Sequence, residues 1–240
     1  MSQHKTSQAP QTPSPNGALI TKRAPRSPAA EAFRIIRTNM EFMGAQGAAG
    51  MWLFTSALAA EGKSTIVANL GVTLAAASRR TLLIDADMRR PNLHALFGIE
   101  IMPGLSQVLT GRKTWQECVR TIDEGLDVLP SGPQPPNPTE LLQTELGQRL
   151  FAEVGDHYEV VLVDAPPALM VADAQVLARW VDQVVLVARA GFTRRDALQE
   201  AFETLQRSGA KRVSTILNQV RRQDGYAYYA YYYANASKRS

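Results

Sequence analysis

Short, continuous runs of apolar residues recur along the chain, and segments with helical periodicity separate them. A strand with one wet face alternates apolar and polar residues, whereas a strand buried on both faces is apolar throughout. The runs in this chain are of the second kind. They predict six strands, at residues 51–55, 81–85, 126–129, 159–164, 181–190 and 212–220.

Helical patterns fill the segments between these runs. Ser27 can cap a helix that has Pro28 at its first position and continues to Gly44. Strands that alternate with helices are typical of a parallel sheet covered on both faces, so we predict a doubly wound α/β fold. The other predicted helices are two short ones before residue 126 and longer ones at residues 64–77, 139–154, 173–179 and 193–209.

The two ends of the chain differ from the part between them. Residues 1–28 are rich in Ser, Pro, Gln, Thr and Ala, which predicts a disordered leader. Residues 221–240 break the strand–helix pattern, which predicts a flexible tail, so one domain is expected at residues 29–220. Six of the seven tyrosines lie in the tail: Tyr226, Tyr228, Tyr229, Tyr231, Tyr232 and Tyr233.

Charge and cysteine content exclude several classes of protein. Both ends are basic, so the part between residues 30 and 221 is mildly acidic although the whole chain has a net charge of +4. We therefore expect no nucleic acid partner. Cys118 is the single cysteine, which excludes a disulfide framework and a thiolate metal site. With no signal peptide and no apolar stretch of membrane length, we expect a soluble, cytoplasmic protein.

A loop with the composition of a phosphate-binding site follows the first buried strand. Backbone N–H groups of a P-loop surround phosphates, its Lys reaches the terminal phosphates, and the next Ser binds Mg²⁺. The strict pattern has a glycine where this chain has Ala57, and an ordinary strand–helix turn is the alternative. The strand–loop–helix context favours phosphate binding and a fold of the P-loop NTPase type. The matching residues are Glu61, Gly62, Lys63, Ser64 and Thr65.

Carboxylates stand at the ends of two further predicted strands. Asp85 and Asp87 follow one strand, and Asp164 ends another. Because ligands of α/β sheets bind at the carboxyl edge, these side chains are expected beside the P-loop, where Mg²⁺ coordination and proton removal need them. An Asp after a strand is often only a turn former or a helix cap, but two such motifs beside a P-loop favour a catalytic site.

Together these motifs resemble the bacterial protein tyrosine kinases (BY-kinases), cytoplasmic autokinases of capsule and exopolysaccharide assembly. The likeness covers roughly residues 29–233, and the motifs occur in the family's order. They are a relaxed Walker A motif at residues 57–64, D-x-D-x-R at Asp85, Asp87 and Arg89, Walker B D-x-x-P at Asp164 and Pro167, and E-x-x-R-x-x-R at Glu31, Arg34 and Arg37.

The resemblance implies ATP and Mg²⁺ as cofactors of an autophosphorylating tyrosine kinase. Backbone groups from Ala60 to Lys63 would hold the phosphates, and Lys63 would neutralise charge on the transferring group. Ser64 and Asp164 would hold Mg²⁺, with Asp85 as a further ligand.

The resemblance also assigns the acceptor side of the reaction. Asp85 or Asp87 would orient or deprotonate the incoming phenol, whose ordinary pKa is near 10, and the sequence leaves open which of them does so. Asn218, just after the last strand, is the candidate for contacting adenine. The tail tyrosines would be the phosphoacceptors.

Partners follow from the same resemblance. Glu31, Arg34 and Arg37 lie three residues apart on one helix face. The resemblance to the family implies that this face is the interface of a ring-like homo-oligomer. A solvated ion-pair stripe is the alternative. The family further implies a membrane-embedded polysaccharide co-polymerase as activator, a cognate tyrosine phosphatase, and a location at the inner face of the plasma membrane through that partner.

Two comparisons bear on this assignment. The family usually has Pro-Gly where this chain has Ala59-Ala60, and nucleotide binding would weaken if the second position required a conformation open only to glycine. The rival group is the partition and septum-positioning ATPases, whose signature Lys would fall at Leu58. That lysine is absent, which counts against the rival group. The alternative functions are a non-kinase, ATP-switched regulator and a scaffold whose weakened P-loop no longer turns over.

Overall fold

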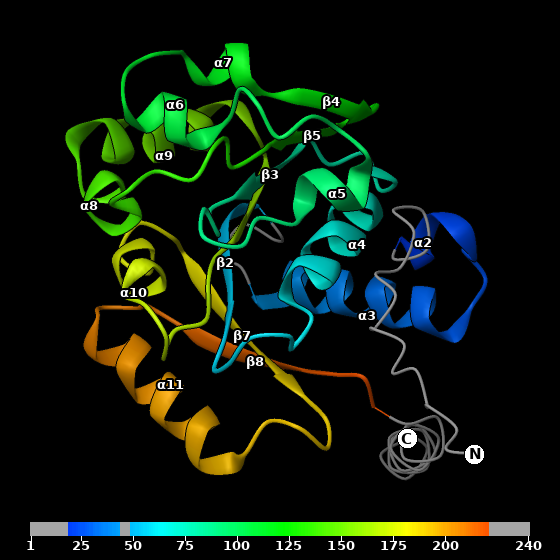
Figure 1. Ribbon diagram of the computed structural model, residues 1–240. Helices are drawn as coiled ribbons and strands as arrows, with labels where there is room; N and C mark the ends of the chain where they lie inside the picture. Colours follow the sequence, from blue (N-terminus) through cyan, green and yellow to red (C-terminus); the bar gives the residue numbers. More distant parts are fainter. Residues whose placement is uncertain (1–18, 44–48, 221–240) are drawn as a thin grey trace, which may run out of the picture.

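The computed structural model describes residues 19–43 and 49–220 of the chain. Figure 1 shows a central sheet with helices packed on both of its faces. Its strands are β2 (Gly50–Ser56), β3 (Thr81–Asp85), β4 (Arg120–Asp123), β5 (Leu126–Leu129), β6 (Val160–Asp164), β7 (Gln183–Arg189) and β8 (Val213–Asn218).

The strand order is β4-β5-β3-β6-β2-β7-β8. Every neighbouring pair is parallel except β4 and β5, which are antiparallel. The predicted doubly wound, mostly parallel α/β fold is therefore confirmed. The order also brings β3, β6 and β2 side by side, so their carboxyl ends meet at one edge of the sheet.

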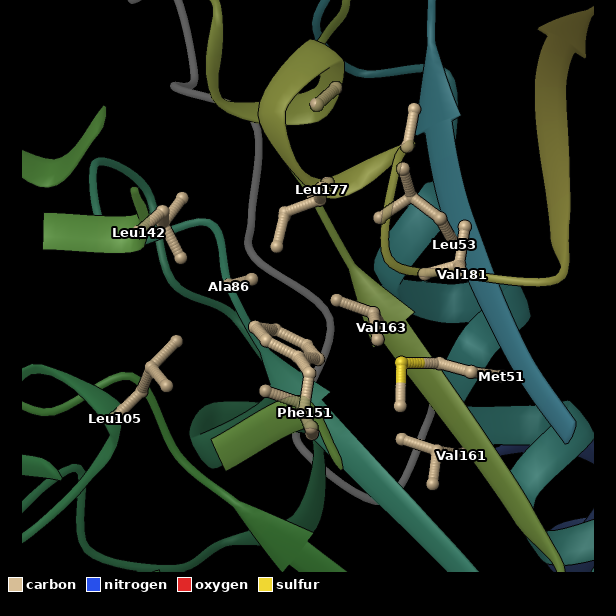
Figure 2. Close-up of a cluster of buried hydrophobic side chains, with 14 of the residues drawn as sticks. Met51, Leu53, Ala86, Leu105, Leu142, Phe151, Val161, Val163, Leu177 and Val181 are labelled. Atoms are coloured by element: carbon tan, nitrogen blue, oxygen red, sulfur yellow. The ribbon is translucent and has the colours of Figure 1, made fainter. Parts of the chain in front are cut away.

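Successive side chains of the central strands pack into two separate hydrophobic cores, one on each face of the sheet. On β2, Leu53 points to one face of the sheet and Phe54 to the other, and both are fully buried. Leu53 belongs to the same buried cluster as Val163 and as Phe151 and Leu177 from the helices, which Figure 2 shows. Because side chains alternate along a strand, a strand with two buried faces must be apolar throughout, as the sequence pattern indicated.

The helices divide between the two faces. The face with Phe54 is covered by α2 (Ile20–Arg23), α3 (Pro28–Met43), α4 (Lys63–Ala75) and α5 (Leu93–Phe97). The face with Leu53 is covered by α6 (Leu105–Leu109), α7 (Trp115–Cys118), α8 (Pro138–Leu142), α9 (Glu145–His157), α10 (Asp173–Leu177) and α11 (Arg195–Arg207).

The structure corrects the sequence interpretation in the middle of the chain. The predicted helix at residues 139–154 is two helices, because the Thr144 hydroxyl accepts a hydrogen bond from the Gly147 N–H at 3.3 Å and starts α9 as a new helix. Strand β4 was not predicted, since it is a four-residue edge strand in which no residue is fully buried. Three short helices, not two, precede β5.

The boundary predicted after residue 28 is wrong. Leu19 is buried in the core beside α4, and the Thr21 hydroxyl donates a hydrogen bond of 3.0 Å to the Asn69 side chain of that helix. The ordered part of the domain therefore includes residues 19–28. The rest of the predicted leader and the predicted tail lie outside the described residues. In the part of the chain that is described, no helix is long and apolar enough to cross a membrane.

Candidate active site

The loop after β2 and the ends of β3 and β6 surround one cleft of about 480 Å³. The loop contributes its backbone and the start of α4, and the segments after β3 and β6 form the opposite walls. The cleft therefore lies at the carboxyl edge of the sheet, where ligands of open α/β sheets bind. Its lining includes Ala60, Gly62, Lys63, Ser64, Thr65, Asp87, Arg89, Arg90, Pro166 and Met170.

The backbone of the loop is shaped to receive an anion. Helix α4 begins at Lys63, and no side chain of the described residues caps its N-terminus, so its first N–H groups are open to a ligand. Gly62 has φ of 91°, and a Cβ atom there would lie 2.2 Å from the Asn218 Nδ2 atom. Glycine is thus required at this position both by its conformation and by the approach of Asn218.

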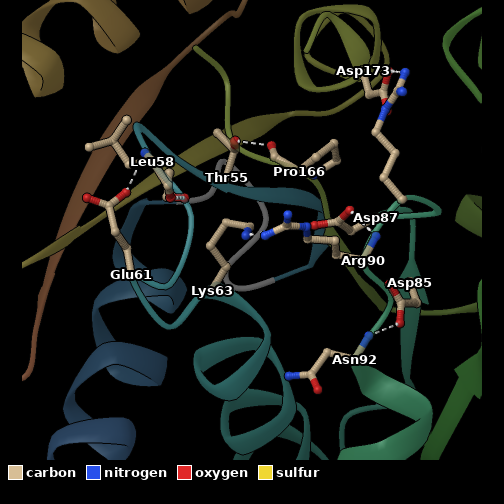
Figure 3. A network of polar contacts seen from close by, with 12 residues as sticks. Thr55, Leu58, Glu61, Lys63, Asp85, Asp87, Arg90, Asn92, Pro166 and Asp173 are labelled. Atoms are coloured by element: carbon tan, nitrogen blue, oxygen red, sulfur yellow. Dashed lines mark hydrogen bonds and ion pairs between the residues drawn. The ribbon is translucent and has the colours of Figure 1, made fainter. Parts of the chain in front are cut away.

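Residues far away in the sequence hold the loop in this shape. The Glu61 carboxylate is fully buried and accepts hydrogen bonds from the Leu58 N–H at 2.8 Å, marked in Figure 3, and from the Thr193 hydroxyl. The Asn218 side chain donates to the Glu61 carbonyl at 2.9 Å. Neither Glu61 nor Asn218 lines the cleft. Both residues support the loop from the side that faces away from the cleft. Contact between Asn218 and adenine stays a prediction.

Lys63 faces the carboxylates from the P-loop side. Its Nζ atom lies 4.0 Å from the Asp87 Oδ2 atom, and both side chains are buried (Figure 3). Burial raises the pKa of Asp87, and the Lys63 charge partly offsets that rise. Asp87 also accepts a hydrogen bond from the Arg90 N–H at 3.0 Å. It is thus a carboxylate that lines the cleft and is held in place beside the P-loop lysine.

Asp85 and Asp164 are paired in register on neighbouring strands and are fully buried. One oxygen of Asp85 caps α5 by accepting from the N–H groups of Asn92 at 3.0 Å and Leu93 at 2.9 Å. The helix-cap alternative therefore holds for that oxygen, while the other has no hydrogen-bond partner among the described residues. Burial, reinforced by Asp164, raises the pKa of Asp85 well above its ordinary value.

Asp164 has the features of a cation ligand. Neither of its buried oxygens has a hydrogen-bond partner among the described residues. Burial raises the pKa of its carboxyl to about 6, although the Lys63 charge and the Ser64 hydroxyl lower it. No described group of three or more His, Cys, Asp or Glu side chains could hold a metal alone. This arrangement fits Mg²⁺, which binds through one or two protein ligands together with water and phosphate oxygens.

The residues of the predicted interface lie on α3, away from the cleft. Arg34 forms an ion pair of 2.6 Å with Glu31 on the same helix, and Arg37 lies 3.8 Å from Glu41. Within one copy these residues thus form intrahelical ion pairs, and their role as an interface stays a prediction. The predicted phosphoacceptor tyrosines lie outside the described residues.

Three residues that hold this site were not singled out from the sequence. Thr193, in the turn after β7, bonds to Glu61 of the loop. Thr139 on α8 and Asp173 on α10 bond to Arg89 at the cleft. No motif marks them, and only the fold brings them to the site. A threonine soon after a buried strand is a weak signal that could have directed attention to Thr193.

Ala60 has φ of 63°, in the left-handed region, where an alanine costs about 1–2 kcal/mol. Contacts of Glu61 and Asn218 hold the loop in this conformation, so we expect the cost to fall on folding rather than on nucleotide binding. We expect Ala60→Gly to stabilise the protein by about 0.5–1 kcal/mol in urea unfolding, with an ADP–Mg²⁺ affinity within about twofold of wild type. Ala59→Gly is the control, and it should destabilise. Equal losses of stability in Ala60→Gly and Ala59→Gly would contradict this interpretation.

Comparison with known proteins places these features in a family. A family model described as an AAA domain matches residues 60–216. The chain is 38% identical over 209 residues to the putative tyrosine-protein kinase CapB of Staphylococcus aureus, covering 87% of this chain and 92% of that protein. It is 39% identical over 214 residues to the tyrosine-protein kinase YwqD of Bacillus subtilis, covering 88% and 90%.

A solved structure agrees with these relatives. The kinase domain of the Escherichia coli tyrosine kinase ETK matches with a TM-score of 0.81 and 32% identity, over 92% of this chain and 84% of that one. The residues matched by the family model include Lys63, Asp85 and Asp164. The chain belongs to the family of bacterial tyrosine-protein kinases.

Proposed function

We propose that this protein is an ATP- and Mg²⁺-dependent tyrosine autokinase that regulates capsule or exopolysaccharide polymerisation and export. Support comes from the juxtaposition at one edge of the sheet: Lys63 faces Asp87 at 4.0 Å, and Asp164 has two buried oxygens without hydrogen-bond partners among the described residues. Phosphoryl transfer needs positioned cations, a metal ligand and a group that accepts the phenol proton. The cleft and the buried end of β6 beside it together offer all three kinds of group.

The chain's own residues have distinct roles in the proposed reaction. The N–H groups from Ala60 to Lys63 hold the phosphates, and Lys63 neutralises charge on the transferring phosphoryl group. Ser64 and Asp164 would hold Mg²⁺, which would supply further positive charge at the phosphates when bound. The tyrosine oxygen forms a bond to the γ-phosphorus, the bond to the ADP oxygen breaks, and ADP leaves.

The phenol proton passes to a carboxylate in this scheme. Asp87 lines the cleft and is the better placed of the two candidates, because Asp85 uses one oxygen to cap α5. The raised pKa of Asp87 brings it closer to that of a phenol, whose ordinary value is near 10. Asp85 then supports Asp164 as a neighbouring carboxylate near the metal.

The proposed acceptors and partners extend beyond the described residues. The described part of the chain ends at Val220, two residues after Asn218, whose side chain contacts the P-loop. We propose that the cluster is phosphorylated within a homo-oligomer. A membrane-embedded co-polymerase would activate the kinase at the inner face of the plasma membrane, and a tyrosine phosphatase would reverse its action.

The direct test is to incubate the purified full chain with ATP and Mg²⁺ and to map phosphotyrosine by mass spectrometry. The expected result is phosphate on residues 226–233, dependent on Mg²⁺. The control replaces the six clustered tyrosines with phenylalanine. ATP hydrolysis without phosphotyrosine in the wild type would contradict the kinase assignment and would favour an ATP-switched regulator.

The interface proposal makes a separate prediction about size. Arg34→Glu with Arg37→Glu reverses the charge of the α3 face and should convert the oligomer to monomers, as measured by light scattering of the unphosphorylated protein. Arg149→Glu with Arg207→Glu applies the same charge change on α9 and α11 and should leave the oligomer intact. Equal sizes for both double variants would show that the α3 face is only a solvated stripe.

A further inference from the structure

A half-buried ion pair lies at the wall of the cleft formed by the segment after β3. The guanidinium of Arg89 donates two hydrogen bonds to the Asp173 carboxylate, from Nε to Oδ2 at 3.1 Å and from Nη2 to Oδ1 at 3.4 Å. The same Nη2 atom donates to the Thr139 hydroxyl at 3.1 Å, and this hydroxyl donates in turn to Asp173. Three elements therefore meet at one point: the segment after β3, helix α8 and helix α10.

The burial of this cluster fixes its geometry. Asp173 is fully buried, whereas about a third of the Arg89 side chain is exposed toward the cleft that it lines. If Arg89 moved away, the buried Asp173 carboxylate would be left without its cation, which would strongly destabilise the fold. Arg89 is therefore held in place. Two parallel bonds between a guanidinium and a carboxylate also fix the orientation of both groups.

The ion pair joins two segments that start side by side. Asp85 and Asp164 are paired in register at the ends of β3 and β6, and Arg89 and Asp173 follow them by four and nine residues. The segments between these points form the cleft wall that carries Asp87. Paired strands hold the wall at one end and the ion pair holds it at the other, so the distance from Asp87 to Lys63 depends on both.

Building on the proposed function, we propose that Asp173 and Thr139 are positioning residues for phosphoryl transfer. They hold Arg89, and through it the segment with Asp87, at a fixed place opposite Lys63. The P-loop is held separately, by Thr193 on Glu61 and by Asn218. Loss of the ion pair should therefore slow the transfer step without weakening nucleotide binding, because misplacing a reacting group by about 1 Å can cost about 10²-fold in rate.

Asp173→Asn keeps the shape of the side chain but removes its charge. We expect kcat for phosphotyrosine formation to fall by about 10–100-fold, as is usual for groups that orient catalytic ligands, with KM for ATP within about twofold. The affinity for ADP–Mg²⁺, measured by calorimetric titration of the full chain, should also stay within about twofold. Thr139→Val should lower kcat by about tenfold, whereas Thr139→Ser should restore it because it keeps the hydroxyl.

Thr144→Val is the matched control, since it removes a hydroxyl from the turn between α8 and α9 that does not contact Arg89. It should reduce thermal stability and leave kcat unchanged. If Asp173→Asn does not fold, the Thr139→Val and Thr139→Ser pair still decides the matter. An active wild type with unchanged kcat in Thr139→Val, or equal losses in kcat and ADP affinity, would overturn the inference alone. A wild type that binds ADP–Mg²⁺ but forms no phosphotyrosine would overturn the proposed function itself.

Discussion

Lys63→Met abolishes phosphotyrosine formation, with an expected loss of at least about 10³-fold in rate, because a cation that contacts the transferring phosphoryl group stabilises its charge in the transition state. Methionine fills a similar volume, so the apolar part of the buried lysine chain is replaced. The measurement is the initial rate of autophosphorylation in the full chain, together with the far-ultraviolet circular dichroism of both proteins.

The control for this variant is Lys113→Met. Lys113 is exposed and pairs with Glu117 on the opposite side of the sheet from the P-loop helix, so its loss should leave the rate unchanged. Removing Lys63 also removes a charge that lowers the pKa values of Asp87 and Asp164, so more of these carboxyls should be protonated near pH 7. Autophosphorylation that persists in Lys63→Met would remove the P-loop from the mechanism.

Asp164→Asn should make the nucleotide-free protein more stable at neutral pH and nearly inactive. The pKa of Asp164 is raised to about 6, above the ordinary value of 3.8, so the folded state binds more protons than the unfolded state between these values. Stability therefore falls as pH rises through this window, on the order of 2 kcal/mol between pH 4.5 and pH 7. Asparagine carries no charge and should abolish most of that fall.

The measurement is urea unfolding across this pH range, without nucleotide and with a chelator present. Burial lowers the pKa of His94, so this residue makes the stability of the fold rise with pH, opposite to Asp164. The relevant quantity is therefore the difference in unfolding free energy between wild type and variant at each pH. Phosphotyrosine formation should fall by at least about 10²-fold in the same variant, because the metal loses its carboxylate. A variant that is less stable than wild type at pH 7 would contradict the expected cost of the buried charge, and unchanged phosphotyrosine formation would remove Asp164 from the mechanism.

The sequence allowed the prediction of those parts of the site that follow directly from strands. Lys63 and Asp164 could be placed because a buried parallel strand has a continuous apolar pattern, and its carboxyl end is where the next polar residue appears. The prediction that Asp85 lies at the end of a strand agrees with the structure, but the sequence did not show that it caps α5. Its position at a strand end is local information, whereas its use as a cap for α5 depends on where that helix begins.

The supporting contacts could not be predicted in the same way. Thr193, Asp173 and Thr139 reach the cleft only through the packing of helices onto the sheet, and nothing in their own neighbourhoods marks them. Leu19 was missed for a related reason. The short run Leu19-Ile20 in a polar segment carries no periodicity, although Leu19 is buried once α4 is in place.

The supports of the P-loop also constrain when the site can form during synthesis. Thr193 lies 132 residues after Glu61, and Asn218 lies 157 residues after it, at the end of the last described strand. A nascent chain therefore exposes its Walker motif long before the residues that shape it have left the ribosome. Because domains fold as units once their distant contacts are available, nucleotide affinity should arise only as β7 and β8 join the sheet. An incomplete polypeptide would then carry the lysine without competing for cellular ATP.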